Sequence, residues 1–141
     1  MIEGVTLTPL RCIHTPKGDV RHALKATEDT YRGFGEAYFS EIHFGERKGW
    51  KRHNRMTLNI VVITGRVKFI ICDNRTNSPT CGQREEIVLS PDTNYQRLTI
   101  APGLWMAFEG LSQGTSILLD IIPEPHDPQE ADSCEWEDLK L

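Results

Sequence analysis

The chain has 141 residues, the length of one domain, and its 20 acidic residues outnumber its 16 basic residues, so that its formal net charge is −4. This mildly negative balance lacks the basic footprint of a nucleic-acid-binding domain, which excludes nucleic acid as the expected partner. Residues 1–12 lack the basic lead and apolar centre of a secretory signal, and no apolar run approaches the ~18 residues of a membrane helix. We expect a single domain over residues 1–141, a cytoplasmic location and no membrane partner.

Metal and disulfide sites are not expected. The four cysteines are widely scattered without a Cys-x-x-Cys pair: Cys12, Cys72, Cys81 and Cys134. That spacing predicts neither a zinc site nor a disulfide framework, so the thiols are expected to be buried or to have no chemical role. His53-Asn54-Arg55 also lacks the second histidine of the His-x-His pair that holds a metal in many small β-barrels. We therefore predict no metal and no cofactor.

The N-terminal third combines short extended runs with turns. Residues 6–15 form an extended run around Pro9, and residues 20–24 are predicted as a short helix, with a strand as the alternative. Residues 28–31 are a polar connection. A strand is predicted within 33–44, and a spacing of two places five side chains on one of its faces: Phe34, Glu36, Tyr38, Ser40 and Ile42.

The central third begins with a loop at 45–49 and a polar cluster at 50–55, and it continues as an alternating apolar stretch over 56–73. Thr64-Gly65 divides this stretch into extended runs at 58–63 and 67–72, which predicts a β-hairpin with a polar mouth. Residues 73–83 are rich in Asn, Ser, Pro and Gly and predict a loop.

The C-terminal third repeats the pattern of short strands. Strands are predicted at 85–89, 97–100, 105–109 and 116–122, and residues 129–141 form an acidic tail. Eight or nine short strands with little helix predict an all-β jelly-roll sandwich or barrel, an architecture often found with a ligand between its sheets.

His53 is the first candidate for chemistry, because a histidine can take or return a proton near neutral pH. In an extended chain Lys51, His53 and Arg55 share one face, and the two cations would attract an anionic substrate. The alternative is a solvated edge with a surface histidine.

Three further residues extend this candidate site. Thr57 and Asn59 continue the same alternation inward, either as a satisfied internal network or as the lining of a ligand cavity. The cavity is favoured because Glu36 offers another polar group on a comparable strand. His126 follows the last long strand, either as a second proton donor at a pocket mouth or as an exposed loop histidine.

Several segments in order along the chain resemble the dTDP-4-dehydrorhamnose 3,5-epimerase family of sugar-nucleotide cupins. The most specific is Asp73-Asn74-Arg75-Thr76-Asn77-Ser78-Pro79-Thr80-Cys81-Gly82, which is similar to that family's Asp-x-Arg-x-x-Ser-Pro-Thr-x-Gly loop. Tyr31-Arg32-Gly33-Phe34-Gly35-Glu36, Leu89-Ser90 and Ile100-Ala101-Pro102-Gly103 resemble three other family segments.

The resemblance implies a metal-free, cupin-type jelly-roll homodimer acting on a nucleotide-diphosphate sugar, dTDP-type, in polysaccharide or deoxysugar biosynthesis. It implies that a histidine removes the proton beside the ketone of a 4-keto-6-deoxyhexose and that a tyrosine returns one from the opposite face. Carried over by position, His53 is the base, Lys51 serves the enolate and Arg52 contacts phosphate or sugar. Arg32 and Glu36 look like nucleotide-side contacts.

The chain also departs from the family pattern. The family's lysine and second histidine fall at Leu58 and Met106, the tyrosine acid falls at His126, and Glu36 is the substitute for the aspartate that orients the base. We expect a nucleotide-sugar epimerase. The alternatives are a keto-sugar isomerase of the 3,4-ketoisomerase type and a non-catalytic sugar-nucleotide-binding cupin.

Overall fold

The computed structural model describes residues 1–139, in which nearly all regular structure is β. The strands are β1 (Val5–Pro9), β2 (Cys12–Ile13), β3 (Val20–Arg21), β4 (Glu36–His43), β5 (Arg47–His53), β6 (Leu58–Thr64), β7 (Val67–Cys72), β8 (Arg84–Leu89), β9 (Gln96–Ile100), β10 (Trp105–Gly110), β11 (Thr115–Ile122) and β12 (Ala131–Ser133). The one helical element in this range is a 3-10 turn, η1 (Trp136–Asp138), so no described helix has the length to cross a membrane.

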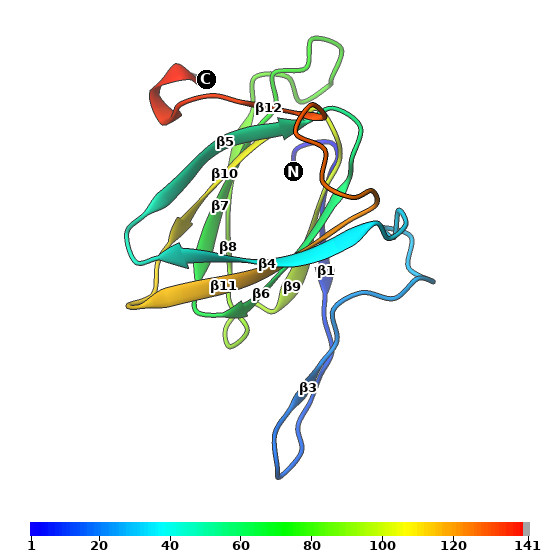
Figure 1. The fold of residues 1–141 in the computed structure, drawn as a ribbon, viewed down its shortest axis with the longest axis vertical. Helices are drawn as coiled ribbons and strands as arrows, with labels where there is room; N and C mark the ends of the chain where they lie inside the picture. Colours follow the sequence, from blue (N-terminus) through cyan, green and yellow to red (C-terminus); the bar gives the residue numbers. More distant parts are fainter. Residues whose placement is uncertain (140–141) are drawn as a thin grey trace.

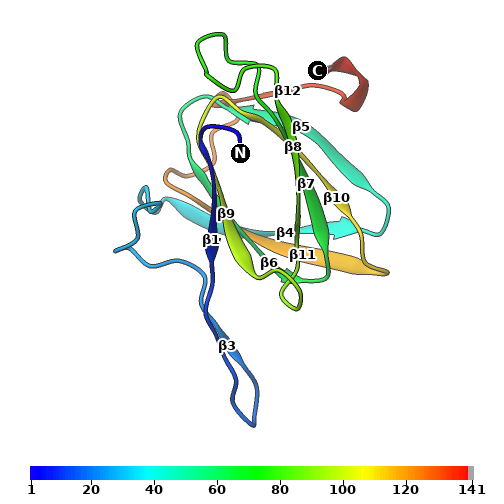
Figure 2. The ribbon, with the colours of Figure 1, turned by 180° about the vertical axis from the view of Figure 1, so that it is seen from behind.

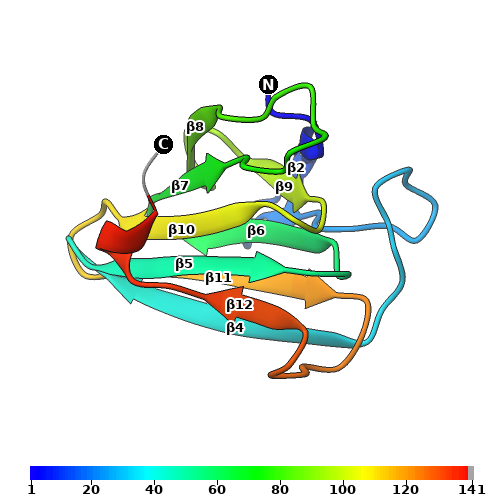
Figure 3. The same cartoon turned by 90° about the horizontal axis from the view of Figure 1, so that it is seen from above.

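Two five-stranded sheets face each other, in the orders β1-β9-β6-β11-β4 and β12-β5-β10-β7-β8 (Figure 1). Their inner faces carry the alternate apolar residues of the strands, such as Leu58, Ile60 and Val62 of β6, which are almost fully buried in the main core. Viewed from above, the sheets lie one over the other (Figure 3). This arrangement confirms the predicted cupin-type jelly roll.

The predicted hairpin at Thr64-Gly65 is wrong, although both of its strands exist. β6 pairs with β9 and β11, whereas β7 pairs with β8 and β10 in the other sheet. Gly65 has a φ of 82°, and a Cβ there would collide with Ser116, so this glycine permits a tight crossing between the sheets. The crossing lets both strands direct apolar side chains into the same core.

Two local predictions are also corrected. Val20 and Arg21 form β3 rather than a helix, because they pair with Ile13 and Cys12 of β2. The β2–β3 hairpin extends away from both sheets (Figure 2). The segment 45–49 is a loop only at its start, since β5 begins at Arg47 and pairs with β10.

The segment after Pro128 returns to the sheet of β5. Ala131 of β12 pairs with His53 of β5, and the Trp50 and Trp136 rings stack with centroids 5.1 Å apart. Trp50 Nε1 donates to the backbone carbonyl of Trp136. Much of the predicted acidic tail is therefore packed against β5, while residues 140–141 lie outside the described part of the chain.

A buried arginine ties β9 to the loop that leads toward β4. The Arg97 side chain is fully buried, and it donates to Glu28 Oε2 (2.6 Å), Thr30 Oγ1 (2.8 Å), the carbonyl of Ala23 (2.7 Å) and Asn59 Oδ1 (3.1 Å). A buried charge with this many partners specifies the path of residues 23–30.

We predict that Arg97→Ala lowers the free energy of unfolding by about 3 kcal/mol, because it leaves Glu28 and several buried acceptors without their donor. Urea denaturation of both proteins measures the change. Arg66→Ala, at an exposed arginine, is the matched control. Equal losses in the two variants would contradict a special role for Arg97.

Candidate active site

A cavity of about 270 Å³ lies between the two sheets. Apolar side chains from β6, β7, β10 and β11 form much of its wall, and its ionisable and hydroxyl groups come from β4, β5 and β11: Tyr38, Ser40, Lys48, Lys51, His53 and Asp120. An apolar chamber with a few convergent polar groups is typical of a small-molecule site.

His53, which lines this cavity, forms a buried polar pair with Glu130 behind it. His53 Nδ1 lies 2.6 Å from Glu130 Oε1, and their side chains are 11% and 0% exposed. Glu130 Oε2 accepts from the backbone N–H groups of Asn54, Arg55 and Met56 at 2.9, 2.8 and 3.0 Å. The carboxylate therefore holds both the imidazole and the turn that follows β5.

Glu130 is ionised at neutral pH. Burial opposes its ionisation, but the backbone N–H of Arg55, the His53 ring and the N–H of Met56 outweigh it and lower the pKa to about 2. Because an ionised carboxylate only accepts hydrogen bonds, His53 Nδ1 must donate. In the neutral imidazole this arrangement leaves the lone pair on Nε2, which is the state required of a general base.

Two lysines of β5 border the same cavity. Lys48 Nζ already donates to Ser40 Oγ (3.2 Å) and to the carbonyl of Glu41 (2.6 Å). Among the described residues, no carboxylate lies within ion-pair distance of Lys51, so its ammonium is available to a ligand. Leu58 and Met106 also line the cavity and make its floor apolar.

Tyr38 and Asp120 supply a second polar pair, from the sheet opposite β5. They are direct partners in the β4–β11 ladder, and Tyr38 Oη lies 2.9 Å from Asp120 Oδ2. Burial raises the pKa of Asp120 to about 7, and burial next to this carboxyl raises the pKa of Tyr38. Asp120 Oδ1 is buried without a hydrogen-bond partner.

Glu36 and His126 lie at an adjoining outer pocket of about 320 Å³, which Tyr38, Lys51 and His53 also line. Glu36 Oε1 accepts from the backbone N–H of His126 at 2.8 Å. Glu36 is thus a neighbour of the site, while Glu130 holds the position beside His53 that the sequence assigned to Glu36.

The three arginines expected at the site do not line the cavity. Arg32 is exposed and donates to backbone carbonyls of its own loop. Arg52 Nη2 lies 2.6 Å from Asp132 Oδ2, and its guanidinium sits over the Trp105 ring, 4.8 Å from its centroid. Arg55 forms an ion pair with Glu124, in which Nε lies 2.9 Å from Oε2. Their roles as substrate contacts stay predictions.

Thr57 and Asn59 are also absent from the cavity lining. Asn59 is buried in the Arg97 network, where its Oδ1 accepts from Thr99 Oγ1 at 2.7 Å. The expected alternation from Lys51 to Asn59 is interrupted because Glu130 binds three consecutive backbone N–H groups between β5 and β6. Of the two alternatives for Asn59, the structure has the internal network.

The family model described as dTDP-4-dehydrorhamnose 3,5-epimerase matches residues 27–141 of this chain. The chain belongs to this family. Membership places it in a family of isomerases, and the fold just described matches the crystal structure of a dTDP sugar isomerase.

Individual relatives agree with this family. A dTDP sugar isomerase from Desulfovibrio desulfuricans G20 has a crystal structure that matches with a TM-score of 0.94, at 31% identity, over 97% of this chain and 87% of that chain. A probable low-salt glycan biosynthesis epimerase of Haloferax volcanii is 25% identical over 133 residues, 93% of this chain and 85% of the relative. ChmJ, a 3'-monoepimerase from Streptomyces bikiniensis in complex with dTDP-quinovose, shares the fold with a TM-score of 0.85. Its sequence is 18% identical, and the match covers 97% of this chain and 72% of that chain.

The most specific family segment, residues 73–82, forms a self-contained loop. Asp73 is fully buried and accepts from Arg75 Nε (2.9 Å), Ser78 Oγ (2.6 Å) and Thr80 Oγ1 (2.6 Å). The Arg75 side chain, with the two hydroxyls, holds the pKa of Asp73 well below its ordinary range. In this family member the motif organises a loop and its residues are not among those lining the cavity.

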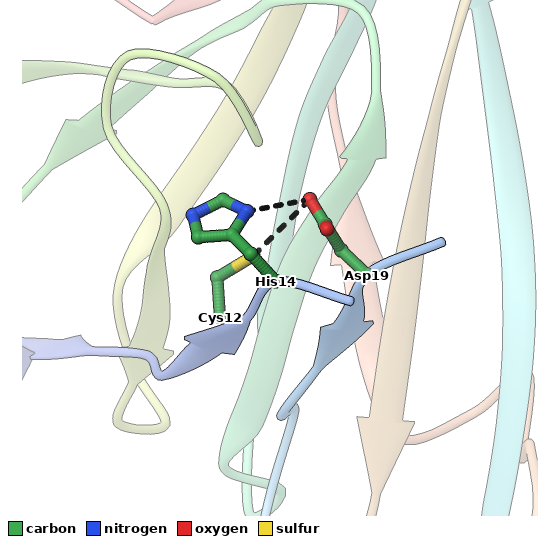
Figure 4. A group of neighbouring side chains, drawn as sticks. All are labelled: Cys12, His14 and Asp19. Atoms are coloured by element: carbon green, nitrogen blue, oxygen red, sulfur yellow. Dashed lines mark hydrogen bonds and ion pairs between the residues drawn. The ribbon is translucent and has the colours of Figure 1, made fainter. Parts of the chain in front are cut away.

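A separate cluster lies on the β2–β3 hairpin. Ligand atoms of Cys12, His14 and Asp19 lie within 4.8 Å of one another, and Asp19 Oδ2 contacts both other side chains (Figure 4). Zinc sites are usually four-coordinate, and this group offers three ligands with His14 and Asp19 exposed. The sequence spacing did not single out this group.

Sequence reasoning missed Glu130, Tyr38 and Asp120. Tyr38 shared a predicted strand face with Ile42, which is buried, and Asp120 interrupts the inward positions Leu118 and Ile122 of β11. Both therefore had a signal, a polar group at a core position. Glu130 had none, because it lies in an acidic stretch outside any periodic element.

We predict that Glu130→Gln reverses the His53 tautomer. The new amide NH₂ donates to Nδ1, so the ring proton moves to Nε2. Long-range ¹⁵N–¹H NMR of the neutral imidazole distinguishes the two forms. Asp132→Asn, which changes the neighbouring carboxylate bound to Arg52 instead, is the control and should retain the Nδ1–H form. The same tautomer in both variants would contradict the assignment.

Proposed function

We propose that this protein is a nucleotide-sugar epimerase that acts on a 4-keto-6-deoxyhexose-type substrate in deoxysugar or polysaccharide biosynthesis. The observation that carries the proposal is the His53–Glu130 pair on a cavity between the sheets. The carboxylate orients the imidazole and leaves one nitrogen free, as proton abstraction requires.

The proposed reaction begins with abstraction of the proton on the carbon beside the ketone. His53 Nε2 forms the new N–H bond, and the electrons of the broken C–H bond move into an enolate. The imidazolium is stabilised by Glu130, 2.6 Å from Nδ1. Return of a proton to the opposite face of the same carbon completes the epimerisation.

The enolate oxygen needs a positive charge, and we assign it to Lys51. Its ammonium borders both the inner cavity and the outer pocket. In a chamber with apolar walls, a preorganised cation stabilises a developing anion more strongly than it would in water. Lys51 thus supplies the electrostatic role in a metal-independent mechanism.

The nucleotide is proposed to be of the dTDP type. This choice rests on family membership and on relatives such as ChmJ, whose complex contains dTDP-quinovose. The outer pocket, with His126 and Lys51 at its wall, is continuous in its lining residues with the cavity and is the proposed route by which the sugar enters.

We predict that incubation with dTDP-4-keto-6-deoxyglucose in heavy water places deuterium on the carbon beside the ketone. His53→Asn should reduce this exchange by about 10²-fold or more, because it removes the base. Proton NMR or mass spectrometry of the recovered sugar measures the label.

The matched control is His43→Asn, since His43 is exposed, bonds Thr115 and does not line the cavity. It should exchange at the wild-type rate. Binding of the sugar nucleotide without any exchange by the wild type would favour a non-catalytic binding protein. Conversion to a 3-keto sugar would favour a ketoisomerase, and exchange surviving in His53→Asn would overturn the base assignment.

We infer that the protein forms a homodimer. β4 is an edge strand, and its outward side chain Phe39 is 65% exposed, as is the nearby Phe34. Exposed aromatics beside a free sheet edge are typical of an interface between subunits. The single-domain organisation and the cytoplasmic location expected from the sequence stay predictions.

We predict that Phe39→Lys converts the dimer to a monomer, because it places a charge in the apolar contact. Light scattering after gel filtration measures the mass. Lys17→Glu, on the β2–β3 hairpin, is the control for a charge change elsewhere. A monomeric wild type would contradict the inference.

A further inference from the structure

An epimerase that works through His53 needs a second group on the other side of the reacting carbon. His53 belongs to β5, in one sheet, and the cavity is closed on the other side by β4, β6 and β11. Among the described cavity-lining residues, the titratable groups of that second sheet are Tyr38 and Asp120. A sugar held between the sheets therefore meets His53 and this pair from opposite sides.

The Tyr38–Asp120 pair is poorly explained as a structural feature alone. Asp120 is 6% exposed at an inward position between Leu118 and Ile122, where an apolar residue would continue the core. One of its oxygens is bonded to Tyr38 Oη, and the other is buried without a partner. A buried, half-satisfied carboxyl lowers stability, which is a common feature of functional groups.

We propose that Tyr38 is the proton donor to the enolate and that Asp120 stores the proton that replaces it. The assignment rests on the function proposed above. It adds a donor at a position other than His126, the residue on which the resemblance placed the family's tyrosine.

The transfer is balanced within the pair. When Asp120 is protonated, its carboxyl O–H can donate to Tyr38 Oη, which turns the phenol proton toward the ligand. The enolate carbon then forms a C–H bond as the Tyr38 O–H bond breaks, and Tyr38 takes the proton of Asp120. The products are the epimer, neutral Tyr38, the Asp120 carboxylate and the His53 imidazolium. Solvent then takes the proton of His53 and returns one to Asp120.

The near-neutral pKa of Asp120, about 7, agrees with a proton store that refills at physiological pH. The titratable groups around it are Tyr38 on β4 and Lys48, Lys51 and His53 on β5, with Glu36 beside Tyr38. His126 is less suited to the role, because it lines only the outer pocket, whereas Tyr38 also lines the cavity between the sheets.

The test separates proton abstraction from proton return. In heavy water, Tyr38→Phe should still place deuterium in the unreacted substrate, because His53 can return a deuteron to the face from which it took the proton. Formation of the epimer should fall by about 10²-fold or more. Tyr95→Phe, at a tyrosine outside the cavity, is the matched control and should form product normally.

Asp120→Asn tests the store independently. Wild-type epimer formation should fall as the pH rises through about 7, where Asp120 loses its proton, and this alkaline limb should disappear in the variant. A merely structural role would change the melting temperature without removing the limb.

The outcomes also separate this inference from the proposed function. A wild type that shows neither exchange nor product refutes both. If the wild type shows exchange and forms product, and Tyr38→Phe forms product at the same rate, the assignment of Tyr38 as donor is refuted while the proposed function stands. Loss of product in His126→Asn, with product retained in Tyr38→Phe, would assign the donor to His126.

Discussion

The buried carboxylate of Glu130 is the constraint on which the site depends. A charge with no exposed surface must be satisfied, and the structure supplies three consecutive backbone N–H groups and the His53 ring. These N–H groups belong to the turn after β5, where the Arg55 side chain pairs with Glu124 and is not among the residues that line the cavity. The same contacts make Nδ1 of the neutral His53 ring the donor and Nε2 the acceptor, so that a structural requirement also sets the tautomer.

The outer face of the β5 sheet holds Glu130 in place. Trp50 stacks on Trp136, and the C-terminal segment packs on an apolar cluster that includes Trp105 and Ile70. Successive side chains of a strand point to opposite faces of the sheet. In β5, Trp50 and Arg52 therefore face this cluster, while Lys51 and His53 face the cavity. One strand therefore joins the packing that positions the carboxylate to the group that the carboxylate orients.

The cavity is divided into an apolar floor and two ionisable sides. Leu58 and Met106 stand where the resemblance placed a lysine and a histidine, and the lysines that line the cavity, Lys48 and Lys51, belong to β5. The opposing pair, Tyr38 and Asp120, comes from the other sheet. In the mechanism we propose, this pair and His53 transfer protons from facing sheets, and the core between the sheets holds them on opposite sides of the reacting carbon.

The sequence alone determined most of the long strands and the jelly roll, and it singled out His53 as the candidate base, because periodicity and residue chemistry are local properties. It could not determine that β6 and β7 belong to different sheets, since a tight turn ends a strand without specifying its partner. It also could not identify Glu130, which meets His53 across 77 positions of the chain. Only the tertiary structure decides which distant polar groups share a buried space, because their pairing depends on how the sheets close and not on the spacing of neighbours.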